Sequence, residues 1–257
     1  MDLGISGRVA LVAASTAGLG RATARALAAE GARVVISGRR AEVVEREAAA
    51  LPGAVGIPAD LTDPGTPEAL VRRTGELLGP VDILVLNGGG PAPGTAADQT
   101  PESLSAAVGS LLLPHQALIR HTLPGMRERG WGRILAIGSS GVNEPLPGLA
   151  LSNAGRAALA GLLKTLASEV AADGVTVNML LPGRIATDRV AALDRARAER
   201  EHTTVEAVAA AARAAIPAGR YGTPEEFGAA AAFLCSAPAS YVTGSQVRVD
   251  GGMARSF

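Results

Sequence analysis

Residues 8–30 read RVALVAASTAGLGRATARALAAE. The apolar run that ends at Ala14 and the Ala-rich stretch from Leu19 onward predict a buried strand, a tight turn and a helix. Glycines in such a turn let the backbone approach a pyrophosphate, whose charge then lies at the helix N-terminus. The same residues also suit a helix start that only needs small side chains for close packing. The candidate cofactor-binding residues of this turn are Ser15, Thr16, Gly18, Leu19 and Gly20.

The rest of the chain repeats this alternation of strand and helix. Continuously apolar runs are typical of strands that are buried on both faces of a parallel sheet. We predict strands at residues 8–14, 33–37, 55–57, 81–86, 133–138, 175–181 and 246–249. We predict helices at about residues 19–30, 41–50, 67–78, 101–129, 149–172 and 224–235. The pattern predicts a single-domain, doubly wound α/β fold of about seven parallel strands over residues 1–257, with helices on both faces.

One segment, at about residues 187–216, interrupts the rhythm. It follows a strand but is long, charged and Ala-rich, and we predict two helices outside the sheet. Its charges are most simply a solvated helix face. The same segment is compatible with a helical substrate lid at the carboxyl edge of the sheet. The residues assigned to the solvated face are Asp194, Arg195, Arg197, Glu199, Arg200 and Glu201.

Composition excludes several classes of protein. Of 257 residues, 24 are Lys or Arg and 24 are Asp or Glu, so a binder of nucleic acid or of an anionic membrane surface is not expected. Aromatic residues make up only 2%, which leaves few stacking platforms. The single cysteine, Cys235, precludes an internal disulfide and is expected to be a packed thiol. No metal-ligand spacing, signal peptide or membrane span is evident, and we expect a cytoplasmic protein.

The end of the second strand bears on the choice of cofactor. A nicotinamide enzyme that uses NAD usually has an acid here, which holds the ribose 2′-hydroxyl. The chain instead has Arg39 and Arg40, and its first acid is Glu42. Two guanidinium groups can face a 2′-phosphate, although an ordinary basic loop would look the same. We therefore predict NADP(H) in preference to NAD(H).

At this point the order of motifs resembles the short-chain dehydrogenase/reductase family, and within it the 3-oxoacyl-carrier-protein-reductase-like branch. The resemblance runs from about Gly7 to Gly252. It includes Ala14-x-x-x-Gly-x-Gly, in which Ala14 stands where the family has glycine, and it includes the C-terminal patterns at residues 222–226 and 249–252. The resemblance implies further cofactor contacts at Asp60, Leu61, Asn87, Gly88, Pro182, Gly183, Ile185 and Thr187.

The catalytic positions depart from this family. Its members carry a Tyr-x-x-x-Lys pair on the helix after the fifth strand, whereas residues 152–156 here read SNAGR. The resemblance places Ser152 at the tyrosine and Arg156 at the lysine, and it retains the family's catalytic serine as Ser139. The asparagine of the family's proton relay is absent. We take Ser139, Ser152 and Arg156 as the candidate catalytic residues.

These departures change the chemistry. In the family the tyrosine protonates the alkoxide that hydride transfer creates, and the lysine lowers the tyrosine pKa and holds the ribose. A serine hydroxyl is shorter and far less acidic than a phenol, and an arginine stays protonated. Tyr221 and Tyr241 are expected to lie far from this helix. The candidates for a replacement donor are His115, Asn143, Glu144 and a bound water.

Three functional hypotheses follow. The first is an NADP(H)-dependent oxidoreductase with a non-standard proton donor, acting on a small carbonyl, hydroxyl or activated-alkene substrate. The second is a non-redox lyase, dehydratase or isomerase on the same scaffold, and the third is a catalytically silent binding subunit. The resemblance also implies a homotetramer or a dimer, for which the Ala-rich helix at residues 154–166 would suit close packing between subunits.

Overall fold

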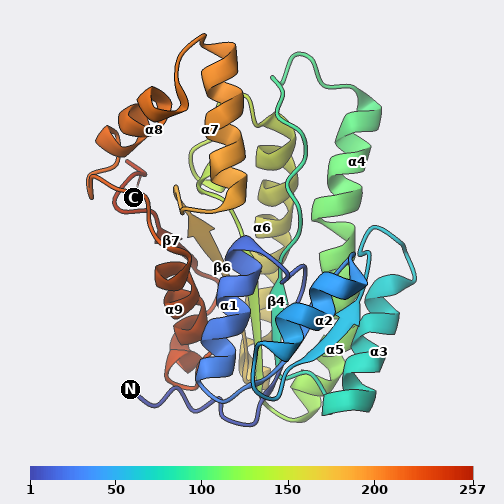
Figure 1. Ribbon diagram of the computed structural model, residues 1–257. Helices are drawn as coiled ribbons and strands as arrows, with labels where there is room; N and C mark the ends of the chain where they lie inside the picture. Colours follow the sequence, from blue (N-terminus) through green and yellow to red (C-terminus); the bar gives the residue numbers. More distant parts are fainter. Residues whose placement is uncertain (257) are drawn as a thin grey trace.

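A parallel β-sheet forms the centre of the molecule (Figure 1). The computed structural model describes residues 1–256, and over these residues it contains one sheet of seven strands in the order β3-β2-β1-β4-β5-β6-β7. Every pair of neighbouring strands is parallel. The strands are β1 (Val9–Val12), β2 (Arg33–Gly38), β3 (Val55–Pro58), β4 (Ile83–Leu86), β5 (Gly132–Ile137), β6 (Val175–Pro182) and β7 (Gln246–Val249). The predicted fold class is confirmed.

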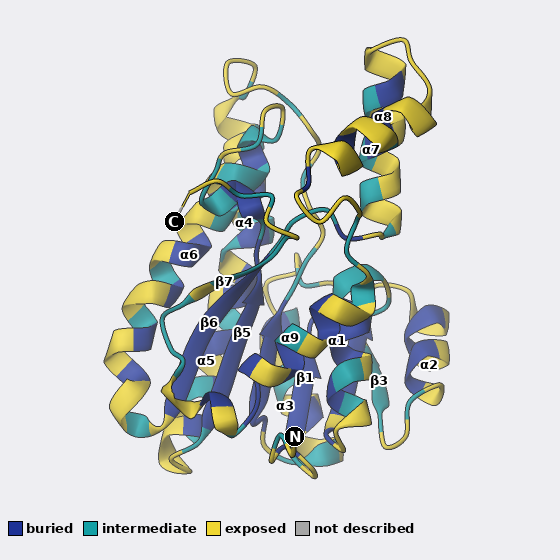
Figure 2. Cartoon of the chain, turned by 90° about the vertical axis from the view of Figure 1, so that its left-hand side faces the viewer, coloured by how far each residue is buried: buried dark blue, intermediate teal, exposed yellow. Residues whose placement is uncertain are grey.

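The helices lie on both faces of the sheet and bury its apolar side chains. One apolar cluster joins alternate strand residues to α1, α2 and α9, and a second joins the other residues of the same strands to α3, α5 and α6. Figure 2 shows the strands buried between helices whose outer surfaces are exposed. The α-helices are α1 (Gly18–Ala29), α2 (Ala41–Ala49), α3 (Thr66–Leu78), α4 (Pro101–Leu111), α5 (Leu113–Glu128), α6 (Ala150–Val170), α7 (Asp188–Arg200), α8 (Val205–Ala214) and α9 (Pro224–Leu234). The short 3-10 helices are η1 (Ser140–Val142), η2 (Ala171–Asp173) and η3 (Pro238–Tyr241).

The prediction of a single helix at residues 101–129 is wrong. The structure divides it into α4 and α5, and Leu112 between them departs from helical geometry with φ of −119° and ψ of −57°. Pro114 explains the break, since proline lacks an N–H and its ring clashes with the carbonyl of the residue four positions earlier. Near a helix start this loss is tolerated, so a new helix begins at Leu113.

The thiol of Cys235 is fully buried at the end of α9, as expected of a packed cysteine. Burial raises its pKa to about 12. Of the helices in residues 1–256, none is long and apolar enough to cross a bilayer.

Candidate cofactor and active site

The loops that leave the strands at their carboxyl ends gather at one edge of the sheet, because all strands run in the same direction. Helices α7 and α8 stand beyond this edge (Figure 1). The order of the strands reverses between β1 and β4, which is where ligands bind in sheets of this kind. The predicted cofactor residues lie in the loops after β1 to β4 and β6, and the predicted catalytic residues lie after β5 and on α6.

Ser15 shapes the turn after β1 from the inside. Its side chain is fully buried, its Oγ donates a hydrogen bond to the Val12 carbonyl at 2.7 Å, and the same Oγ accepts one from the Ser37 N–H at 3.0 Å. Thr16 packs over Gly38, where a Cβ would lie 2.8 Å from the Thr16 methyl group. The side chain of Ser15 therefore holds β1 to β2 and is not available to a ligand.

Asn87, directly after β4, holds the same turn in place by hydrogen bonds from its side chain. Its Nδ2 donates hydrogen bonds to the carbonyls of Ala13 at 3.2 Å and Ala14 at 2.9 Å. Gly20 fits below this amide, because a Cβ there would lie 2.5 Å from Asn87 Nδ2. Ala14 adopts a left-handed backbone with φ of 46°, a conformation that favours glycine. The turn is therefore built around close contacts before any ligand is considered.

The N-terminus of α1 is open to an anion. Its N-cap residue is Ala17, which makes no side-chain hydrogen bond to the first turn. Gly18 has a positive φ of 54°, which brings the backbone round into the helix. The first N–H groups of a helix lack internal partners, and the helix dipole favours negative charge there. Leu19 packs against the apolar cluster, so its side chain anchors the start of the helix.

A pocket of about 450 Å³ lies at the ends of β2 and β3, and Arg39 and Asp60 are among the residues that line it. Arg39 and Asp60 are both exposed to solvent. Asp60 accepts hydrogen bonds from the Oγ1 and N–H of Thr62, which lower the pKa of its carboxyl group, with a smaller contribution from Arg39. Arg40 is the N-cap of α2 beside this pocket, while Leu61 packs against the core below it.

The segment after β6 packs tightly against β7. Gly183 is required there, because a Cβ would lie 2.6 Å from the Cβ of Asp250. Ile185 is buried in the core, so only its backbone faces the edge of the sheet. The Thr187 hydroxyl caps α7 by accepting the Val190 N–H at 3.4 Å and donates to the Ile185 carbonyl at 3.3 Å. Pro182 ends β6.

Two of the three candidate catalytic residues, Ser152 and Arg156, contact each other on α6, and Ser139 lies in the loop that leads from β5 toward this helix. Arg156 Nε donates to Ser152 Oγ at 3.3 Å, and Arg156 Nη1 donates to the Ile137 carbonyl, at the end of β5, at 2.9 Å. Ser139 is the second residue after β5, and its Oγ accepts the Gly141 N–H at 3.1 Å. Over residues 1–256 both serine oxygens act as acceptors and neither hydroxyl proton has a protein partner. Both hydroxyls are therefore free to donate to a ligand.

Two neighbouring groups set the electrostatics of this corner. Burial, and then the charge of Arg189, lower the pKa of Arg156 to about 10, so its guanidinium stays charged at neutral pH. His115 is buried under the loop after β4, with its Nδ1 2.8 Å from the Leu111 carbonyl. Burial lowers the pKa of His115 below its usual value although hydrogen bonds at Leu111 and Asn87 oppose this, and the charge of Arg156 adds a smaller lowering.

Of the other residues considered, Glu144 and Tyr221 are engaged elsewhere, and the Asn143 side chain makes no hydrogen bond within residues 1–256. The carboxylate of Glu144 accepts the backbone N–H groups of Arg255 and Ser256 at 2.7 and 2.6 Å, and these bonds lower its pKa. The Tyr221 hydroxyl donates to Asp194 at 2.8 Å, and Tyr241 is fully exposed.

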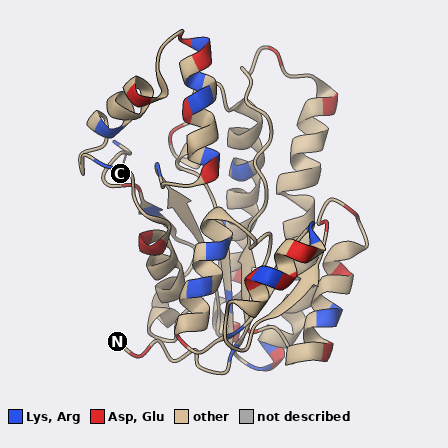
Figure 3. Ribbon diagram, viewed as in Figure 1, with Lys and Arg blue, Asp and Glu red and all other residues tan. Residues whose placement is uncertain are grey.

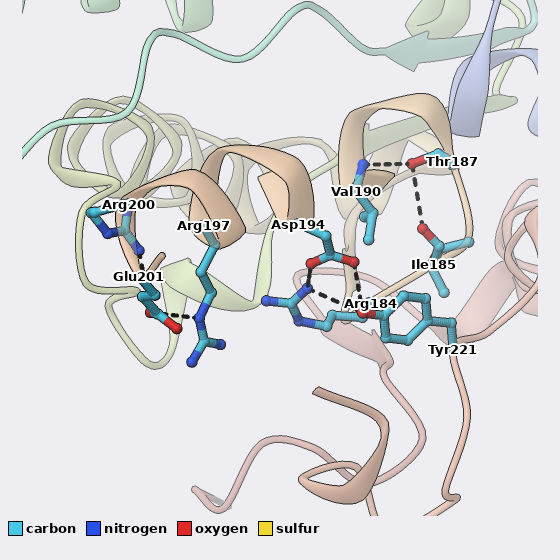
Figure 4. A network of polar contacts seen from close by, with 9 residues as sticks. All are labelled: Arg184, Ile185, Thr187, Val190, Asp194, Arg197, Arg200, Glu201 and Tyr221. Carbon is cyan, nitrogen blue, oxygen red and sulfur yellow. Dashed lines mark hydrogen bonds and ion pairs between the residues drawn. The ribbon is translucent and has the colours of Figure 1, made fainter. Parts of the chain in front are cut away.

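The prediction that Asp194 belongs to a solvated face is wrong. Asp194 is only 3% exposed, and its carboxylate pairs with Arg184 and accepts the Tyr221 hydroxyl (Figure 4). It lies four residues from both Val190 and Ala198 on the inner face of α7, a spacing that could have revealed its burial. This network joins the segment after β6, helix α7 and the segment before α9.

Sequence reasoning also missed Arg189, in the first turn of α7. Its Nη2 donates to the Pro91 carbonyl at 3.1 Å, and its guanidinium covers Gly90, where a Cβ would lie 3.2 Å from Nη2. Only its place two residues after Thr187 hinted at this contact. In the part of the chain that the structure describes, no group of three His, Cys, Asp or Glu side chains is placed to hold a metal ion.

The seven-stranded parallel sheet, with the N-terminus of α1 at its switch point, defines a doubly wound fold of the dinucleotide-binding class. A family profile described as Enoyl-(Acyl carrier protein) reductase matches residues 13–254. The chain belongs to the short-chain dehydrogenase/reductase family.

Particular relatives span nearly the whole chain. Dehydrogenase/reductase SDR family member 4 of Sus scrofa is 37% identical over 255 residues, which cover 97% of this chain and 88% of that protein. A 3-oxoacyl-acyl-carrier-protein reductase of Vibrio cholerae is 34% identical over 252 residues, covering 98% and 99%. The crystal structure of L-sorbose reductase from Gluconobacter frateurii, complexed with NADPH and L-sorbose, matches with a TM-score of 0.94 and 32% identity over 100% of both chains.

Proposed function

We propose that the chain is an NADP(H)-dependent oxidoreductase that acts on a small carbonyl, hydroxyl or activated-alkene substrate with a non-standard proton donor. The proposal rests on the structure of the sheet edge at β1, β2 and β3. There the turn after β1 is hydrogen-bonded to Asn87, the N-terminus of α1 has no side-chain cap, and Arg39 lines a pocket. NADPH is present in the crystal structure of the related L-sorbose reductase, which supports the choice of cofactor.

The residues present fit such a cofactor at two separated points. The uncapped N–H groups of α1 would hold a pyrophosphate, and Gly18 leaves room for its approach, since the nearest atom to a Cβ there is the Thr187 methyl group at 3.9 Å. Arg39 lines the pocket with no carboxylate of residues 1–256 within ion-pair distance, so its guanidinium is available to a 2′-phosphate. When bound, the nicotinamide supplies or accepts the hydride.

The chain's own residues polarise the substrate. The free hydroxyl protons of Ser139 and Ser152 can donate to a carbonyl oxygen, and Arg156 places a positive charge beside Ser152. Donors that are already oriented toward a developing oxyanion lower the barrier without reorganisation. Arg156 contributes as a charge, because a group with a pKa of about 10 does not release its proton at neutral pH.

The proton itself comes from water in this proposal. His115 is neutral and buried, Glu144 is ionised and bonded to the C-terminal segment, and Tyr221 is bonded to Asp194. A positioned general acid typically contributes about 10²–10⁴ in rate. We therefore expect the chemical step to be slower by up to that factor than in family members that have the tyrosine.

Calorimetric titration of the protein with NADPH and then NADH tests the proposal first. We expect NADPH to bind in the micromolar range and NADH at least about tenfold more weakly, which corresponds to about 1.4 kcal/mol. Arg39→Asp should remove this preference, and Arg46→Asp, an exposed arginine on α2 outside the pocket lining, is the matched control.

Single-turnover loss of NADPH absorbance with a panel of ketones, aldehydes and enones then tests the chemistry. Absence of binding by either cofactor contradicts the oxidoreductase proposal. Binding without turnover of any substrate favours the silent binding subunit.

We also propose that residues 187–216 act as a lid and that the protein is a cytoplasmic homo-oligomer. In support of assembly, Leu104 and Val108 on α4 and Leu113 on α5 are exposed, and Figure 3 shows α4 nearly free of charge. Residues 154, 157, 158 and 161 form an exposed face of small residues on α6. Gel filtration with light scattering tests the assembly, and a monomer would contradict it. Fractionation of the source cells tests the location, and recovery in the membrane or secreted fraction would contradict it.

A further inference from the structure

Two guanidinium groups without counter-charges lie on the β4–β5–β6 side of the sheet edge. They belong to Arg156 on α6 and Arg189 on α7. Among residues 1–256, no carboxylate lies within 4.0 Å of either group. Arg189 is exposed to solvent and Arg156 is half-buried. Because a partly desolvated cation without a partner is costly, Arg156 in particular calls for an anion that the described residues do not supply.

Arg156 has unused donors. Its contacts with Ser152 Oγ and the Ile137 carbonyl engage Nε and Nη1, and Nη2 has no partner among the described residues. A guanidinium carries five N–H donors in a planar fork. The side chain is half-buried, and burial lowers its pKa, which shows that its charge lacks the solvation it would have in water.

Arg189 approaches the same corner from the other side. Its Nη2 reaches the Pro91 carbonyl at 3.1 Å, and Gly90 leaves room for the guanidinium above the loop after β4. Strands β4 and β5 are neighbours in the sheet, so this loop lies beside the loop that carries Ser139. The charge of Arg189 is felt at Arg156, whose pKa it lowers. An anion bound near both groups would offset this repulsion.

Helix α7 is held in the position that this contact needs. The carboxylate of Asp194, one turn and a half along α7, is bonded to Arg184 and Tyr221 (Figure 4). Thr187 caps the helix immediately before Arg189. The guanidinium of Arg189 is thus presented from a fixed helix start.

We propose that Arg156 and Arg189 form a carboxylate-binding site for the substrate, so that the protein acts on carboxylic acids whose reacting carbonyl is close to the carboxylate, as in 2-oxo acids. The inference rests on the proposed oxidoreductase function. In such an acid the carboxylate meets the two guanidinium groups while the neighbouring carbonyl oxygen meets the free hydroxyls of Ser139 and Ser152. Arginine suits this task, because its fork matches both oxygens of a carboxylate.

The phosphates of the cofactor are the rival source of the anion. They are expected at the α1 terminus and the Arg39 pocket, which lie at β1, β2 and β3. Arg189 contacts the loop after β4 and Arg156 contacts the end of β5, on the opposite side of the switch point in the strand order. A carboxylate should therefore bind together with NADPH and not in its place.

The test uses 2-oxobutanoate and its neutral methyl ester as probes. Each is titrated calorimetrically into protein that is already saturated with NADP⁺, which cannot reduce either probe, so the measured heat reports binding alone. We expect the acid to bind at least about tenfold more tightly than the ester, which is the lower range for hydrogen bonds to charged groups. Arg189→Gln should remove this difference while leaving NADPH affinity unchanged.

Matched variants separate charge from structure. Arg195→Gln, an exposed arginine of the same helix with no ion pair among the described residues, should behave like the wild type. Arg189→Lys keeps the charge without the fork and should retain part of the preference for the acid. Arg156→Gln should also abolish the preference, and the affinity of this variant for NADPH is measured separately.

Four results overturn the inference: no binding of the acid, equal binding of acid and ester, equal effects of Arg189→Gln and Arg195→Gln, or displacement of NADP⁺ by the acid. Failure of NADPH to bind contradicts the proposed function instead. In that case the two probes are titrated into the protein alone, and the same comparison of variants decides whether the carboxylate site exists.

Discussion

Replacing Asp194 by asparagine tests how helix α7 is held. The carboxylate is 3% exposed and serves two donors, Arg184 and the Tyr221 hydroxyl at 2.8 Å. Hydrogen bonds to a charged group contribute about 1.5–3 kcal/mol each, but asparagine keeps one acceptor oxygen. The Arg184 side chain is 28% exposed, so water recovers part of what its guanidinium loses. We therefore expect a net loss of about 2 kcal/mol, from one charged bond of this kind.

Hydrogen exchange measured by mass spectrometry is the assay, because the loss is local to α7 and its contacts. A loss of about 2 kcal/mol corresponds to a roughly 30-fold fall in the protection of α7 amides, while those of α1 should change little. Asp188→Asn, an exposed carboxylate of the same helix, is the control and should change protection less than about threefold. If α7 is as well protected in the Asp194→Asn variant as in the control, the network does not hold the helix.

Three further predictions concern the stability and chemistry of single residues. Ala14→Gly should raise the free energy of unfolding by about 0.5–1 kcal/mol, measured by thermal unfolding. The left-handed conformation costs alanine about 1–2 kcal/mol, and the greater freedom of glycine in the unfolded chain offsets part of this gain. As the control, Ala210→Gly in the exposed middle of α8 should lower the free energy of unfolding by about 1 kcal/mol. Cys235, with a pKa raised to about 12 by burial, should resist iodoacetamide at pH 8 in the native protein and react in guanidinium chloride, and rapid native labelling would contradict its burial. Glu226 should titrate by NMR with a pKa of about 2, because hydrogen bonds from Arg220 lower it. Its contribution to stability is therefore present above pH 4.5 and is lost as the pH falls toward 2. Arg220→Gln should return the pKa of Glu226 toward 4.5.

The strands could be predicted from the sequence because each is buried on both faces and has a short, continuous apolar run. Each of the seven observed strands begins and ends within two residues of the predicted positions. The division between α4 and α5 was missed, although Pro114 marks it, because the apolar periodicity continues on both sides of the break.

The site was harder to predict, because its contacts join distant parts of the chain. The position of Ser152 and Arg156 on one helix face follows from their spacing of four residues. The contact of Arg189 with Pro91 does not, since no local pattern indicates which loop a helix start will meet. Asp194 was assigned to the surface because its neighbours in the sequence are charged, while tertiary contacts bury its own side chain.

The hydrogen bonds of Asn87 have a kinetic consequence. The turn after β1 is held at both Ala13 and Ala14 by this one amide, so the surface for a dinucleotide exists in advance and needs no ordering on association. The proposed substrate side depends on α7, and within residues 1–256 this helix reaches the loop after β4 through the hydrogen bond from Arg189 to the Pro91 carbonyl. On the proposed function, we therefore expect the dinucleotide surface to need little rearrangement on binding, whereas the geometry of the substrate side depends on where α7 lies.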